Sequence, residues 1–163
     1  MKSVKKLTTL ALFTTIALTI FMLESAIPPL VPIPGIKLGL ANIVTLTLLV
    51  KSNWKDALIV LVMRIILGSI FAGQMMSFFY SLAGGLLCLL VMALLHKILS
   101  SKFLWFISIA GAIGHNIGQI LVAMIILDSG YVLYYLPYLL ISGIITGLFT
   151  GLCAHFLHPR LNF

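Results

Sequence analysis

Acidic residues are nearly absent from this chain of 163 residues, which contains only three, Glu24, Asp56 and Asp128, with no two close in sequence. A metal-dependent prenyl or phosphoryl transferase needs clustered carboxylates, because Mg²⁺ is held by oxygen ligands. No glycine-rich segment ends in Gly-Lys-Ser/Thr, so a phosphate-cradling loop for ATP hydrolysis is also missing. We therefore do not expect this polypeptide to be an enzyme by itself.

Cysteine is also scarce: Cys88 and Cys153 both lie inside apolar runs and lack the paired spacing of a metal site. Such residues are typical of small packing side chains, and they predict no disulfide, zinc site or haem attachment. His155 and His158 have a spacing that metal sites use, but no carboxylate lies near them in the sequence. We interpret this pair as a solvated helix end, and we expect no bound metal or cofactor.

What the chain has in abundance is apolar sequence. It is 62% hydrophobic and 8% charged, with a mean hydropathy of +1.24, and no soluble domain of this length could bury so much apolar surface. The apolar runs cover approximately residues 7–27, 36–50, 57–71, 75–95, 103–127 and 131–157. Because roughly 20 helical residues cross a bilayer core, the second and third runs are marginal in length. We predict one all-α membrane domain, residues 1–163, with about six transmembrane helices.

The cations indicate how this domain is oriented. If the chain crosses six times, one side holds Lys2, Lys5, Lys6, Lys51, Lys55, Lys97, Lys102 and Arg160. The opposite side holds only Lys37, Asp128 and, near a helix end, Glu24. By the positive-inside rule both termini are cytoplasmic, and the net charge of +7 reflects topology rather than nucleic-acid binding. Cleavage of the first run as a signal peptide would spoil this asymmetry, so we expect that run to be retained.

Two rows of small residues predict close helix packing. The sixth run carries Gly143, Gly147 and Gly151, and the first run carries the weaker row Ala11, Thr15 and Thr19. Small side chains at intervals of four residues let helix backbones approach closely in lipid. Packing within the chain is the default interpretation, and docking of a partner helix is the alternative.

Arg64 is the sharpest anomaly among the apolar runs. It lies near the middle of the third run, where an arginine costs about 2.5–3.5 kcal/mol on insertion scales. One hypothesis is that an internal partner, Glu24, compensates its charge. The other is that the guanidinium fork holds an anion from outside, such as a substrate carboxylate or phosphate. The sequence leaves both open.

Other polar residues lie in the same central-to-outer part of the membrane, counted inward from the outer ends of the runs. They are Asn42, His115, Asn116 and Gln119, with Lys37 above them at the outer boundary. Such side chains are costly to expose to lipid, so they should face either a ligand-binding cavity or a purely structural polar network. The proline-rich loop before Lys37, residues 28–35, is either a stiff connector or a lid over the cavity.

Three segments of the chain resemble a known family. Lys37–Val44, Gly111–Gln119 and the pair of Arg64 with Gly68 are similar to small bacterial membrane proteins labelled heptaprenyl diphosphate synthase component I, or Gx transporter family. The resemblance extends over nearly the whole chain and implies the cytoplasmic membrane of a bacterium. That family looks related to the substrate-binding S components of energy-coupling factor transporters. Those are six-helix proteins with cytoplasmic termini and an outward-facing pocket for a vitamin or precursor.

The resemblance implies a first hypothesis, an S-component-like subunit that captures a small organic anion, with an isoprenoid or quinone precursor as the candidate. Arg64 and Lys37 would attract the anion near Glu24. Asn42, His115, Asn116 and Gln119 would orient it. An energy-coupling T subunit, contacted through Ala11, Thr15 and Thr19, and its ATPases would be the partners.

Two further hypotheses remain. The chain could be a non-catalytic membrane component of heptaprenyl or polyprenyl diphosphate synthesis, bound to a soluble synthase subunit that carries the aspartate-rich metal site. It could also be a structural or quinone-linked subunit of a membrane redox complex, although the sequence shows no cofactor attachment motif.

Overall fold

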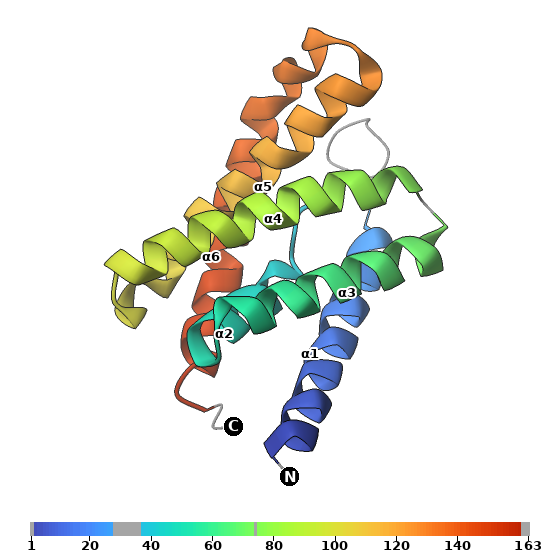
Figure 1. Ribbon diagram of the computed structural model, residues 1–163. Helices are drawn as coiled ribbons and strands as arrows, with labels where there is room; N and C mark the ends of the chain where they lie inside the picture. The colour runs from blue at the N-terminus through green and yellow to red at the C-terminus, as the bar shows by residue number, and fades with distance from the viewer. Residues whose placement is uncertain (1, 28–36, 74, 161–163) are drawn as a thin grey trace.

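The computed structural model describes residues 2–27, 37–73 and 75–160, and this part of the chain is helical without a strand (Figure 1). Six α-helices follow one another, with short 3₁₀ turns at Ser101–Phe103 and Gly130–Tyr135. The α-helices are α1 (Lys2–Ser25), α2 (Asn42–Lys51), α3 (Trp54–Ala72), α4 (Met75–Ile98), α5 (Leu104–Leu127) and α6 (Leu136–Leu157). The predicted all-α bundle is therefore confirmed.

Four helical segments of the described chain are long and apolar enough to cross a membrane: Val4–Ser25, Met75–Ile98, Ser101–Leu127 and Gly130–Leu157. The protein is thus a membrane protein by the length and composition of its helices. The remaining two helices depart from this pattern, because α2 has only 10 residues and α3 contains three charged side chains. The count of six spans and the cytoplasmic position of the termini stay predictions.

The two marginal apolar runs form helices of unequal length. The second run was expected to be helical from residue 36, but α2 begins only at Asn42. Gly39 before it has a φ of +82°, a left-handed conformation that interrupts a helix. The third run gains length instead, because α3 starts at Trp54, where the Asn53 side chain accepts a hydrogen bond from the Asp56 N–H.

The helices form two unequal groups. α5 packs along both α4 and α6, whereas α1 packs mainly on α3 (Figure 1). In Figure 1, α5 and α6 project beyond α4 at the upper end of the molecule, and the start of α1 and the end of α6 lie toward the lower end. The short helix α2 lies inside the bundle and contacts α3, α4 and α6. Its buried leucines Leu46, Leu48 and Leu49 belong to the main hydrophobic core.

The two rows of small residues face different surroundings. A Cβ added at Gly147 would lie 2.7 Å from Ile109 Cα, and one at Gly151 would lie 2.6 Å from Trp105 Cα, so α6 touches the backbone of α5. A hydrogen bond of 2.9 Å between Ser108 and Thr150 crosses the same contact. In contrast, Ala11, Thr15 and Thr19 are exposed on α1. The glycine row packs within the chain, and a partner helix for the α1 row stays a prediction.

Candidate functional site

Arg64 lies in the middle of α3 with 2% of its surface exposed. Its Nη2 donates a hydrogen bond of 3.0 Å to Asn42 Oδ1, whereas its Nε has no hydrogen-bond partner among the described residues. In the described ranges the ion pair found within 4.0 Å is Lys6–Asp56 at 2.7 Å, so no carboxylate there forms a salt bridge with Arg64. The Nε–H donor of this buried guanidinium is therefore left without a partner in the described part of the chain.

Glu24, which one of the two hypotheses pairs with Arg64, is bonded to the backbone. Its side chain is 4% exposed, and its two oxygens accept the N–H groups of Gly39 at 2.5 Å and Leu40 at 3.0 Å. The carboxylate interacts electrostatically with Arg64 and Lys37, but from beyond ion-pair distance of the guanidinium. Glu24 thus fixes the end of α1 to the segment that precedes α2.

Phe21 connects the two cations of the site. Lys37 Nζ lies 3.3 Å from the centroid of its ring, and Arg64 Cζ lies 5.9 Å from it. The ring fits because it packs on Gly68, where an added Cβ would come within 2.5 Å of it. Both contacts have cation–π geometry, which stabilises positive charge near an aromatic face.

Lys37 lies outside the helices, at the entrance to α2, where its Nζ donates to Ser25 Oγ at 2.5 Å. Partial burial lowers the pKa of Lys37 to about 8; the positive charge of Arg64 acts in the same direction, and Glu24 opposes it. The ammonium is therefore held positive at neutral pH and loses its charge at moderately alkaline pH.

His115 lies between two glycine backbones. A Cβ at Gly39 would lie 3.0 Å from the imidazole Cδ2, and one at Gly84 would lie 2.9 Å from Cε1. The same Gly39 Cβ would lie 2.7 Å from Asn42 Nδ2, so the amide of Asn42 and the imidazole of His115 both lie beside Gly39. Neither ring nitrogen makes a hydrogen bond of good geometry, although the Gly84 backbone is adjacent. His115 is also within electrostatic range of Arg64.

Asn116 and Gln119, the other two predicted polar residues of α5, make no hydrogen bond with Arg64 in the described chain. Asn116 Nδ2 donates to the carbonyl of Leu139, so this side chain ties α5 to α6. Gln119 lies one helical turn beyond His115, fully buried, and neither of its amide atoms has a partner in the described chain. Ser77 of α4, also fully buried, has an unpartnered hydroxyl. The predicted lid, residues 28–35, lies outside the described residues.

We define the polar centre as Glu24, Lys37, Asn42, Arg64 and His115, contributed by α1, the segment before α2, and α2, α3 and α5. It offers a guanidinium, an ammonium, an amide and an imidazole, groups that suit recognition of an anion. Within the described ranges no group of three or more His, Cys, Asp and Glu residues could hold a metal ion.

Sequence reasoning missed three contributors to this site. Phe21, Ser25 and Gly39 each contact a charged member of the polar centre. Phe21 could have been found, because it lies three positions before Glu24 and hence on the same face of a helix. Nothing in the sequence indicated that the backbone of Gly39 would bond a carboxylate fifteen residues earlier.

Comparison with curated proteins and with solved structures gives no match. A family model described as heptaprenyl diphosphate synthase component I matches residues 13–157, which include every member of the polar centre. Because this match covers most of the chain, the protein belongs to the heptaprenyl diphosphate synthase component I family.

Proposed function

We propose that the chain is a non-catalytic membrane subunit that binds the anionic group of a small organic ligand in its polar centre. The observation that carries this proposal is Arg64, which is buried, makes one hydrogen bond and has no carboxylate within ion-pair distance in the described part of the chain. Burying a charge without a partner is strongly unfavourable. A ligand carboxylate or phosphate on the guanidinium fork would supply that partner.

The surroundings of Arg64 support an anionic ligand over a structural ion pair. Both oxygens of Glu24 already accept backbone hydrogen bonds, so this carboxylate is engaged away from the guanidinium. Lys37 adds a second positive charge, and Asn42 Nδ2 and the His115 nitrogens add polar atoms that have no partner of good geometry. These groups would orient the ligand once Arg64 and Lys37 have attracted it.

The ligand would be an isoprenoid or quinone precursor with a carboxylate or phosphate group, captured from outside. The family description, which names a prenyl diphosphate synthase, supports the isoprenoid class. Since the sequence has no nucleotide-binding loop, energy for uptake would come from partner subunits, such as a T subunit with its ATPases.

Native mass spectrometry tests the proposal. The protein is purified gently from its own membrane, and small molecules that co-purify with it are recovered by organic extraction. We expect a stoichiometric small anion that is lost from Arg64→Ala but kept by Lys102→Ala, which removes an exposed cation in the turn between α4 and α5. Retention of the anion by a well-folded Arg64→Ala variant would overturn the assignment.

A second candidate function is that of a membrane component of polyprenyl diphosphate synthesis, supported by the family description. It predicts stable co-purification with a soluble, aspartate-rich synthase and a change in the activity or product length of that enzyme when the membrane subunit is removed. An empty protein that co-purifies with such a synthase would favour this function over anion capture.

A further inference from the structure

An apolar groove lies between α3 and α4, away from the polar centre. It has a volume of about 510 Å³. The lining residues are Leu49, Asn53, Trp54, Leu58, Leu86, Leu89, Leu90, Ala93, Leu94, His96 and Lys97. Leu49 and Leu89 are buried members of the main core, so the groove reaches from the lipid-facing surface down to that core. Leu86, Leu90 and Leu94 follow one another at intervals of four residues along α4 and are each more than 40% exposed.

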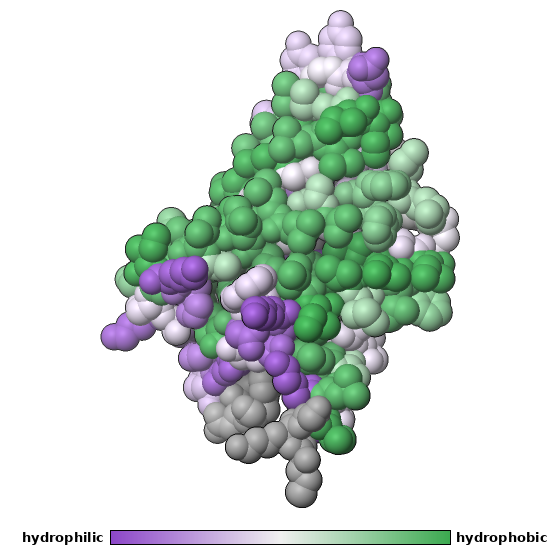
Figure 2. Space-filling view, viewed as in Figure 1, coloured by the Kyte–Doolittle hydropathy of each residue, from purple (hydrophilic) through white to green (hydrophobic). Residues whose placement is uncertain are grey.

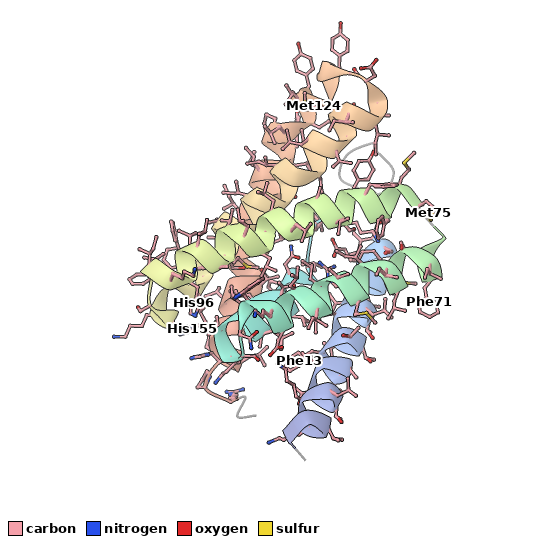
Figure 3. The ribbon with its side chains drawn as sticks, viewed as in Figure 1. Phe13, Phe71, Met75, His96, Met124 and His155 are labelled. Carbon is pink, nitrogen blue, oxygen red and sulfur yellow. The ribbon has the colours of Figure 1, made fainter. Side chains whose placement is uncertain are left out.

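The polar residues of the groove lie at one of its ends. His96 and Lys97 belong to the last turn of α4, Asn53 caps the start of α3, and Trp54 is the first residue of α3. Figure 3 labels His96 at this end of α4, and in Figure 2 hydrophilic residues meet the hydrophobic surface of α3 and α4 in the same lower part of the molecule. The remaining lining residues are leucines and one alanine. The groove is thus apolar along its length and polar at its mouth.

The charge at the mouth is positive. Lys97 lines the groove, and Lys55 Nζ lies 5.8 Å from the Trp54 ring centroid beside it. No carboxylate lines the groove. The nearest acid in sequence, Asp56, is paired with Lys6 and lines a different cavity. An apolar channel with a cationic mouth is complementary to an amphiphile with an apolar tail and an anionic head.

We propose that this groove binds a single-chain prenyl phosphate or diphosphate, with the tail along Leu86, Leu90 and Leu94 and the head at Lys97. The choice of a prenyl tail rests on the polyprenyl candidate function above, whereas the groove shares no lining residue with the polar centre. The membrane component would then hold the isoprenoid beside the turn between α2 and α3, where a soluble synthase could reach its head.

The two tryptophans of the chain allow a local readout. In a Trp105→Phe background, Trp54 is the only tryptophan, and it lines the groove. The full chain in phosphatidylcholine nanodiscs is titrated with farnesyl diphosphate while Trp54 emission is recorded. We expect saturable binding, with geranyl diphosphate at least about ten-fold weaker, because each buried methylene contributes roughly four-fold in affinity. Farnesol is expected to bind about ten-fold more weakly through loss of the charged head.

Two pairs of variants make the test specific. Leu86→Phe with Leu90→Phe should fill the groove and weaken farnesyl diphosphate binding at least ten-fold. Leu121→Phe with Ile125→Phe places the same change, with the same spacing, on exposed positions of α5 and should leave binding unchanged. Lys97→Gln should weaken the diphosphate and leave farnesol unaffected, whereas Lys102→Gln should affect neither.

The proposal is overturned if the Leu86 and Leu90 double variant binds normally, if inorganic pyrophosphate binds as tightly as farnesyl diphosphate, or if phosphatidylglycerol in the nanodisc displaces the ligand. The last result would identify the groove as a site for bilayer phospholipid. Arg64→Ala separates the two proposals, because it should abolish anion capture in the polar centre and leave the Trp54 response intact.

Discussion

The α5–α6 pair and the α1–α3 pair join their helices by different means. In the first pair, Gly147 and Gly151 bring the two backbones into contact, and the Ser108–Thr150 hydrogen bond crosses between them. In the second pair, α1 is mostly exposed and meets α3 through the Lys6–Asp56 ion pair and the packing of Phe21 on Gly68. The other end of α1 is held by Glu24 to the segment before α2. The charged part of the candidate site lies on the side of the second pair. Close backbone packing therefore holds α5 against α6, whereas polar bonds of α1 hold the residues of the candidate site in place.

The largest expected effect comes from breaking the backbone contact. Gly147→Leu should lower the free energy of unfolding by about 3 kcal/mol, because the new side chain meets Ile109 Cα and cannot be accommodated by a rotamer change. Ala11→Leu, on the exposed face of α1, should change it by less than about 0.5 kcal/mol. Thermal unfolding in detergent, followed by tryptophan emission, measures both. Equal losses would refute the contrast between the two pairs.

The next effect comes from the bonds of Glu24 at the C-terminal end of α1. Glu24→Gln should lower the free energy of unfolding by about 2 kcal/mol, because charge-assisted hydrogen bonds to the N–H groups of Gly39 and Leu40 become neutral. It should also increase hydrogen exchange of these two amides. Ser129→Ala, at the loop that begins the 3₁₀ turn before α6, serves as a control for loss of a weak side-chain-to-backbone bond. Unchanged exchange at Gly39 would contradict this role of Glu24.

Lys37 should make anion binding at the candidate site dependent on pH. Its pKa is lowered to about 8 mainly by partial burial, so the ammonium is charged below that pH and neutral above it. If an anion binds the polar centre, its affinity should fall several-fold between pH 7 and pH 9 as one attractive charge is lost. Lys37→Gln should bind more weakly at pH 7 and show a flat profile. A wild-type profile that is flat across this interval would remove Lys37 from the site.

The smallest effect concerns the ion pair of Asp56 with Lys6 near the N-terminal end of α1. Burial opposes ionisation of Asp56, but the hydrogen bonds from Lys6, Ser52 and Asn53 outweigh it and lower the pKa of this carboxyl. Because the pKa of Asp56 is lower in the folded chain, its ionised carboxylate stabilises the fold at pH values above the ordinary pKa of 3.8. This stabilisation is lost as the pH falls below 3.8 and through the lowered pKa of the folded chain. We expect a contribution of about 1 kcal/mol, because Lys6 is exposed. Asp56→Asn should remove the corresponding pH dependence of the unfolding midpoint between about pH 5 and pH 3.

The sequence predicted the site only in part. The depth of Arg64, Asn42 and His115 in their apolar runs indicated that they face inward, because insertion cost disfavours such side chains in lipid, and all three are buried. It could not assign Asn116, which bonds the Leu139 carbonyl of α6 instead. The rotation of a helix about its axis depends on how it packs, and one apolar run does not fix it.

By itself the sequence determined that this is an all-α membrane protein and that α6 carries a close-packing face, because hydropathy and the four-residue spacing of Gly143, Gly147 and Gly151 are local properties of the chain. Only the tertiary structure decided which groups meet Arg64. It brings Asn42 to the guanidinium and turns Glu24 toward the backbone of Gly39 and Leu40. These contacts join residues far apart in sequence, so they depend on the left-handed turn at Gly39 and on the packing of α1 against α3.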